Sequence, residues 1–265
     1  MGVTHYVYKL LREAAPGTDS SATRSPLSPS QLPPVMQFAL LVSALCHDID
    51  HPGHRNDFEV LTKSPLTRMY GEVAVLEQHH IATAEELLKH HGCDLLEMMN
   101  DQEQALFRRV LRDSIMATDM SAHGSLVAEI EHRANNNNHE EASLGEDWQL
   151  FVCRAVLHAA DLSSCVRKFA VASNWAERID EEFASQVRKE VGAGLRPEAD
   201  LKKQEARTGV QRLDQELQFL LAVARPMWTA VVRLWPTLAL LQTQLESNIS
   251  QYHSIRDQEL KREKA

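Results

Sequence analysis

The sequence of 265 residues predicts an all-α fold, a compact multi-helix bundle. Apolar residues recur at helical spacing along most of the chain, and alternating β-branched runs are nearly absent. Glycine and proline number only ten each, which leaves few signals for tight turns. The length fits one large domain or two small ones and is ample for a buried core, and no internal repeat is visible.

The expected elements follow from this periodicity. A first helix is predicted over residues 3–14, followed by a mobile Pro/Ser-rich loop over residues 16–34. A strongly apolar helix over residues 35–50 should end near Pro52, because proline disfavours the α conformation in the residue before it. Residues 1–255 are expected to form one domain and residues 256–265 a charged tail. Further helices are predicted at 72–91, 101–122, 125–136, 147–161, 171–191, 206–232 and 234–250.

Composition and charge narrow the function. Lys plus Arg total 28 against 37 Asp plus Glu, so the net charge is −9, a poor match to nucleic acid. The four cysteines form no CxxC pair, which suits a reducing compartment. No window approaches the ~20 apolar residues of a membrane span, and no signal peptide is visible. We expect a cytoplasmic protein without a direct membrane segment, although a longer, membrane-anchored parent protein stays open.

The segment from His47 to His51 carries the strongest chemical signal. His47 and Asp48 offer an imidazole and a carboxylate side by side, and His51 lies four residues beyond His47. On a helix this spacing would place all three side chains on one face. Histidine and carboxylate clusters are typical ligands of divalent cations. The sequence therefore indicates metal-assisted hydrolysis.

Three further segments place polar residues in apolar settings. Glu77 and His80 lie one helical turn apart, and Asp119 follows a small apolar stretch. The run from Ala155 to Leu162 is hydrophobic, yet it carries His158 and Asp161. A buried carboxylate needs a partner or a metal, because burying an isolated charge is costly.

These segments resemble successive motifs of the class I 3′,5′-cyclic nucleotide phosphodiesterase catalytic domain. Their order and spacing agree over most of residues 36–185, and a weaker similarity returns after residue 215. The resemblance implies an all-helical domain of the HD-type metal phosphohydrolases. The matching runs are His47-Asp48 with His51 and Asn56, Leu76-Glu77-Gln78-His79-His80, Ala117-Thr118-Asp119-Met120, His158-Ala159-Ala160-Asp161, the run from Trp175 to Phe183, and Arg225-Pro226-Met227-Trp228.

By position, the resemblance implies a role for each residue. His47, Asp48 and Asp161 would ligate a tightly held ion, usually Zn²⁺. Asp48 would also bridge to a second ion, Mg²⁺ or Mn²⁺, held mainly through water. The implied reaction is hydrolysis of cAMP or cGMP to the nucleoside 5′-monophosphate by a metal-activated hydroxide. His51, Glu77 and Thr118 would orient the waters, Asn56, His80 and His158 would support the ligands, and Ile179, Phe219, Glu216 and Met120 would contact the substrate.

Two departures from the family pattern stand out. The first is that the family's H-N-x-x-H-A-x-D-V-T motif supplies the general acid and a fourth metal ligand, whereas Val3-Thr4 matches only its end. Both histidines would then lie upstream of residue 1. General acid help is typically worth ~10²–10⁴-fold in rate, so residues 1–265 alone are expected to be crippled.

The second departure concerns the nucleotide base. The family places a glutamine three residues before a phenylalanine that stacks on the purine, and here Glu216 precedes Phe219. An amide donates and accepts hydrogen bonds, whereas an ionised carboxylate only accepts. Since guanine presents two adjacent donors and adenine one donor and one acceptor, Glu216 is expected to favour guanine. Ile179 would form the opposite wall.

Two alternatives remain beside this interpretation. Another HD-type phosphohydrolase would share the metal ligands but lack the purine clamp of Ile179 and Phe219. A non-catalytic regulatory module would keep the bundle without the general acid. Regulatory domains in a longer parent protein and a homodimer also stay open.

Overall fold

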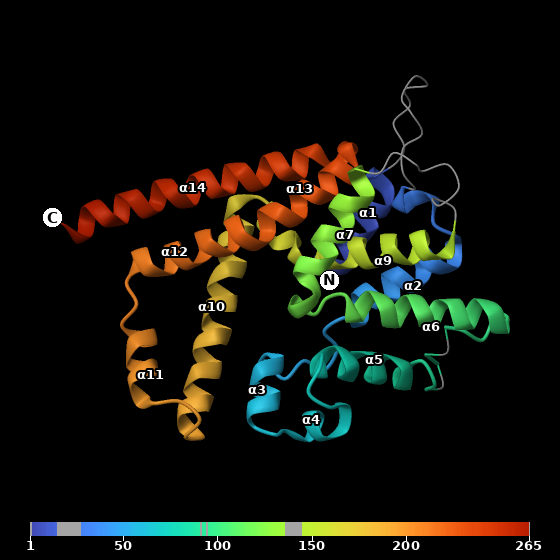
Figure 1. The fold of residues 1–265 in the computed structure, drawn as a ribbon, viewed down its shortest axis with the longest axis horizontal. Helices are drawn as coiled ribbons and strands as arrows, with labels where there is room; N and C mark the ends of the chain where they lie inside the picture. The colour runs from blue at the N-terminus through green and yellow to red at the C-terminus, as the bar shows by residue number, and fades with distance from the viewer. Residues whose placement is uncertain (1, 15–27, 91, 94, 136–144, 265) are drawn as a thin grey trace. The chain divides into compact units, whose positions relative to one another are not determined.

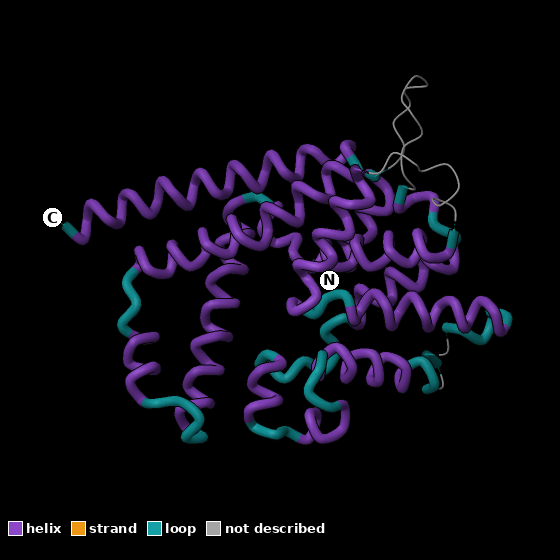
Figure 2. The backbone as a smooth tube through the Cα atoms, in the orientation of Figure 1, coloured by secondary structure: helices purple, strands orange, loops and turns teal. Residues whose placement is uncertain are grey.

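A computed structural model describes residues 2–14, 28–90, 92–93, 95–135 and 145–264. Every regular element within these ranges is a helix, as Figures 1 and 2 show. The predicted all-α fold is therefore confirmed. The chain divides into two compact units, each described here by itself. The first unit comprises residues 1–51, 73–163 and 229–239, and the second comprises residues 52–72, 164–228 and 240–265.

The first unit is built around an apolar helix, α2 (Pro34–Cys46), which contacts four other helices. The most buried of them is α9 (Glu146–Asp161), which is apolar nearly all round and packs on α1, α2 and α6. Such burial is expected of a core helix, whereas surface helices keep a polar face. The partners of α2 are α1 (Gly2–Glu13), α5 (Val75–Leu87), α6 (Asp101–Met116) and α9, and α7 (His123–Asn135) follows the short 3₁₀ turn η2 (Met120–Ala122).

Local sequence explains why α6 begins and where it buries its apolar face. Asn100 accepts a hydrogen bond from the Glu103 backbone N–H, and the Glu103 side chain accepts one from the Asn100 N–H, both at 3.0 Å. This reciprocal capping box satisfies two donors that a helix start leaves unpaired. Phe107, Leu111 and Ile115 then follow at four-residue spacing and are fully buried.

The second unit contains the long helix α10 (Phe169–Gly192), which packs on α11 (Glu198–Glu205). Gln186 of α10 binds the segment around α3 (Asn56–Leu61). Its carbonyl accepts from the Arg55 N–H at 3.0 Å, and its amide donates to Asp57 at 3.2 Å. The remaining elements of the second unit are α4 (Pro65–Tyr70), α12 (Gly209–Phe219), the π-helical turn η4 (Leu220–Ala224) and, except for its first residue, α14 (Ala239–Glu263). The sequence boundary between the units falls within η3 (Leu162–Val166) and within α13 (Arg225–Leu234), and η5 (Pro236–Leu238) belongs to the first unit.

Asn248 of α14 is fully buried and binds the chain just before α10. Its amide donates to the carbonyl oxygens of Cys165 at 2.7 Å and Arg167 at 2.8 Å. We expect Asn248→Ala to lower the free energy of unfolding by about 2–3 kcal/mol, because both carbonyls lose their donor. Urea denaturation measures this effect. Ser250→Ala, at an exposed position on the same helix, is the control, and an equal effect of both substitutions would contradict the assigned role of Asn248.

Several predicted boundaries were wrong, for physical reasons. The helix predicted over residues 35–50 ends at Cys46, and residues 47–50 form a turn. The short helices α3, α4 and α11 were not predicted, because six to eight residues carry little periodicity. The helix predicted over residues 206–232 is interrupted by the π-helical turn η4.

The structure describes the predicted loop and the charged tail in part. Residues 16–27 of the predicted loop lie outside the described residues. The rest of that loop contains a 3₁₀ turn, η1 (Pro29–Gln31), capped by Ser28, and the first residue of α2. The charged tail continues α14 as far as Glu263.

One helical stretch, Gly209–Leu234, is long and apolar enough to cross a membrane by length and composition alone. The expectation that no window reaches this limit was therefore wrong. Less than half of its most apolar window is buried, and core helices of soluble proteins pass the same test, so the evidence for a membrane span is weak.

Candidate metal centre and ligand cavity

A tight turn, and not a helix face, presents the residues of the first candidate site. After α2 ends at Cys46, the Ile49 N–H donates to the Cys46 carbonyl at 3.0 Å, and the His51 N–H donates to the Asp48 carbonyl at 3.2 Å. Asp50 takes a left-handed conformation with φ of 59°, which aspartate tolerates better than most residues. The predicted helical geometry was wrong here, although the side chains still converge.

Two histidines of α5 hold this turn in place. His80 Nδ1 donates to the Ile49 carbonyl at 2.7 Å, and His79 Nε2 lies 2.9 Å from Asp50 Oδ2. The two contacts fall on consecutive residues of the turn and lock its backbone. The contact of His79 with Asp50 agrees with the interpretation of this histidine as one that fixes neighbouring side chains.

His47, Asp48 and Asp161 meet at the end of α2. His47 Nε2 lies 3.2 Å from Asp48 Oδ2 and 3.3 Å from Asp161 Oδ1. His47 Nδ1 lies 3.0 Å from the Ala44 carbonyl, to which it donates, so in the neutral ring Nε2 carries the lone pair. One nitrogen and two carboxylate oxygens are thus aimed at one point.

The electrostatics of this trio favour a cation. Burial disfavours charge on His47, but hydrogen bonds with Asp161 and Asp48 outweigh it and raise the pKa of His47 to about 10. Burial would raise the pKa of Asp48, yet the hydrogen bond with His47 and the charges of nearby histidines lower it. In the absence of metal, a proton on His47 Nε2 therefore supplies positive charge between the two carboxylates.

The three ligands fit a divalent metal ion. Tetrahedral coordination at Zn–N and Zn–O distances of about 2.1 Å separates neighbouring ligand atoms by about 3.4 Å, close to the two separations found here. The donor set of one imidazole and two carboxylates suits Zn²⁺ and other borderline cations.

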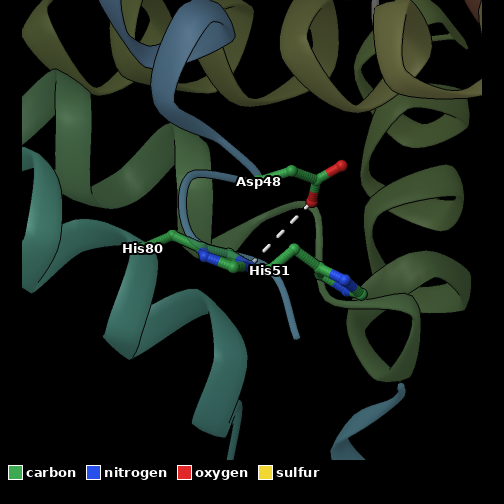
Figure 3. A group of neighbouring side chains, drawn as sticks. All are labelled: Asp48, His51 and His80. Carbon is green, nitrogen blue, oxygen red and sulfur yellow. Dashed lines mark ion pairs between the residues drawn. The ribbon is translucent and has the colours of Figure 1, made fainter. Parts of the chain in front are cut away.

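A second group shares Asp48 with the first. It consists of Asp48, His51 and His80, whose nitrogen and oxygen atoms lie within 4.8 Å of one another. Figure 3 shows His80 reaching from α5 toward the turn that carries Asp48 and His51. His80 Nε2 lies 4.0 Å from Asp48 Oδ1, and the His51 and His80 rings stack with centroids 5.7 Å apart. Asp48 is therefore placed to bridge two cations.

Burial keeps His80 uncharged. Burial lowers its pKa to about 4, and the hydrogen bond to Ile49 and the charge of Asp48 only partly oppose this effect. A neutral imidazole that donates through Nδ1 leaves the Nε2 lone pair free for a metal or a water molecule. His80 was predicted only to support the ligands, and its position makes it a candidate ligand as well.

The other predicted residues of the first unit differ in burial and in hydrogen bonding. His158 is fully buried on α9, and its Nε2 lies 2.8 Å from His123 Nδ1. Burial and His123 lower the pKa of His158 to about 4. Thr118 is buried at the end of α6 and donates to the Ile115 carbonyl at 2.7 Å. Glu77 lies half-buried in the first turn of α5, and Met120 is 48% exposed on η2.

The second unit encloses a cavity of about 690 Å³. Three of the predicted substrate-binding residues line it, namely Ile179, Glu216 and Phe219, and Asn56 lies outside this lining at the start of α3. Phe169, Phe183 and Tyr252 add aromatic walls that the sequence did not predict, because nothing in the chain links their distant positions. An apolar cavity with few polar groups is typical of small-molecule sites.

Trp175 of α10 lies at the surface, with an exposed fraction of 42%, similar to that of Ile179 on the same helix. The other three tryptophans, Trp148, Trp228 and Trp235, are buried.

Residues 1–245 match the sequence profile of the 3′5′-cyclic nucleotide phosphodiesterase family. The chain belongs to this family. It is 30% identical over 224 residues to the probable 3′,5′-cyclic-AMP phosphodiesterase pde-4 of Caenorhabditis elegans, and 31% identical over 223 residues to the 3′,5′-cyclic-AMP phosphodiesterase 4C of Rattus norvegicus. Each match covers 82% of this chain but only 32% and 40% of those relatives, so the chain spans about a third to two fifths of their length.

A solved phosphodiesterase structure has the same fold. The phosphodiesterase domain of the Salpingoeca rosetta rhodopsin phosphodiesterase superimposes with a TM-score of 0.85 at 27% identity, covering 99% of this chain and 75% of that one. The resemblance inferred from the sequence motifs is thus confirmed at the level of family and fold. Family membership also implies dependence on metal ions.

Proposed function

We propose that this phosphodiesterase hydrolyses a 3′,5′-cyclic nucleotide to the nucleoside 5′-monophosphate with the help of two divalent cations. The proposal depends above all on one observation. Carboxylate oxygens of Asp48 and Asp161 lie 3.2 Å and 3.3 Å from His47 Nε2. The similarity to a 3′,5′-cyclic-AMP phosphodiesterase of rat and a probable one of Caenorhabditis elegans supports the reaction class.

In this mechanism His47, Asp48 and Asp161 would hold the tight ion, for which Zn²⁺ suits the donor set. Asp48 would also contribute to a second site, for Mg²⁺ or Mn²⁺, beside His51 and His80. When bound, such ions acidify water for nucleophilic attack and neutralise charge on the phosphoryl oxygens.

The other predicted site residues would position the water and the substrate. The half-buried Glu77 carboxylate can accept a hydrogen bond from water, and the Thr118 hydroxyl keeps its lone pairs available while its proton is held by Ile115. Ile179 and Phe219 line a cavity wide enough for a nucleoside base. Stacking on an aromatic ring tolerates either purine, so the choice of base depends on polar groups in the cavity.

Turnover by the full-length protein tests the proposal. With Zn²⁺ and Mg²⁺ present, we expect release of AMP from cyclic AMP or of GMP from cyclic GMP, detected by chromatography. A strong chelator should stop the reaction, and restored metal should recover it, because the nucleophile depends on the bound ions. Metal binding without turnover of either nucleotide would favour a regulatory module instead.

A further inference from the structure

The cavity of the second unit contains one buried polar group without a protein partner, the Tyr252 hydroxyl, and a half-buried carboxyl group, that of Glu216. The Tyr252 hydroxyl is buried and makes no hydrogen bond to any described residue. Burial, followed by the charge of Asp180, raises the pKa of Glu216 to about 7, and no hydrogen bond contributes to that shift. Buried polar groups are nearly always hydrogen-bonded, so the unpaired Tyr252 hydroxyl, in the cavity that Glu216 also lines, indicates a ligand that would complete it.

The surroundings of Glu216 favour the protonated form of its carboxyl group. Asp180 lies across the cavity on α10 and is itself paired with Arg207 at 2.6 Å, so its negative charge is partly offset. Arg212 is the only permanently positive side chain among the described residues that line the cavity. The titratable and charged groups that face Glu216 are Glu177 and Asp180 of α10, Cys165 of η3, Arg212 of α12, and Tyr252 and Glu259 of α14, with Arg207 behind Asp180.

The two states of a carboxyl group match different purine edges. A protonated carboxyl donates through its O–H and accepts through its carbonyl, which complements the N1 acceptor and N6 donor of adenine. An ionised carboxylate only accepts, which complements the adjacent N1–H and N2–H donors of guanine.

We infer that the proton on Glu216 selects the purine: the protonated cavity prefers adenine nucleotides and the ionised cavity prefers guanine nucleotides. The inference rests on the proposed function, since it assumes that the cavity receives the base. It replaces the fixed guanine preference expected from the sequence with one that depends on pH. The sign follows from titration, because Glu216 carries its proton below a pH of about 7 and loses it above.

Binding of the two reaction products provides a test that needs no turnover. AMP and GMP differ only in the base, so the titration of the phosphate and of the metal centre affects both alike and cancels in their ratio of dissociation constants. We expect the preference for AMP over GMP to fall at least about tenfold between about pH 5.5 and about pH 8.5, as measured by calorimetry with the full-length protein.

Two variants complete the design. Glu216→Gln fixes an amide that does not titrate, so the ratio should become independent of pH. Glu205→Gln, an exposed change on α11 outside the cavity, should keep the pH dependence. A constant ratio in the unaltered protein, a pH dependence that survives in Glu216→Gln, or no binding of either nucleotide would overturn the inference.

Cyclic nucleotide turnover, assayed separately, distinguishes the two proposals. Turnover together with a constant AMP-to-GMP ratio would overturn only the role of Glu216. A shifting ratio without turnover would support the role of Glu216 and count against the proposed reaction.

Discussion

Asp161→Asn should reduce cyclic nucleotide turnover by about 10³-fold or more and abolish tight retention of metal. Asparagine keeps the shape of the side chain but removes the negative charge that lies 3.3 Å from His47 Nε2. The tight ion then loses an anionic ligand, and the several kcal/mol of charge stabilisation that a bound metal supplies are lost with it. Metal content after gel filtration and turnover under saturating substrate measure the two effects.

Asp257→Asn is the matched control for this experiment. It removes a carboxylate from an exposed position on α14 in the second unit and should leave metal content and turnover unchanged. A thermal unfolding curve for each variant shows whether the fold is intact. Full turnover and full metal content in Asp161→Asn would rule out Asp161 as a ligand.

Zinc binding near neutral pH should release about one proton from His47, and the apparent affinity should rise about tenfold per pH unit between about pH 6 and about pH 8. Burial opposes the charged ring, but hydrogen bonds with Asp161 and Asp48 hold the pKa of His47 at about 10, so an ion must displace the proton on Nε2. The lowered pKa of Asp48 leaves its carboxylate ionised throughout this range.

In the metal-free protein, rising pH lowers the stabilising contribution of His47, whereas it raises the affinity for zinc. Because the pKa of His47 is raised on folding, its contribution to stability is present in full below the unfolded value of about 6.5 and is lost as pH rises through about 10. Metal and proton therefore compete for one nitrogen. Competition with a chelator of known pH dependence measures the affinity, and a pH indicator in weak buffer measures the proton.

Two substitutions separate His47 from the other histidines. His47→Gln should lose most of the zinc affinity and the pH dependence, whereas the exposed His5→Gln on α1 should keep both. Zinc affinity that stays constant from pH 6 to pH 8 in the unaltered protein would contradict the assigned state of His47.

Local patterns were sufficient to predict the helical class and most of the long helices. Apolar residues at helical spacing over more than ten residues predict a helix without knowledge of the tertiary structure, as they did for α6 and α9. The short helices α3 and α4 were missed, because each spans only six residues, too few for a periodic signal, and helices this short depend on packing.

The candidate site divides in the same way. The residue types of the metal centre could be read from the chain, since a run such as His47-Asp48 is rare in ordinary helices. Its geometry could not, because the turn after Cys46 depends on His79 and His80, which lie about thirty residues away. A contact between distant segments leaves no periodic signal.

By itself, the sequence determined the helical class, the family and the identity of the histidines and carboxylates, because these depend on residue type and spacing. Only the tertiary structure decided how those residues act. It showed that a turn presents His47 and Asp48 and that His80 is neutral. It also showed that burial and the nearby charge of Asp180 raise the pKa of Glu216 to about 7. The reason is physical: a side chain's charge depends on its burial and neighbours, and both are set only when the chain folds.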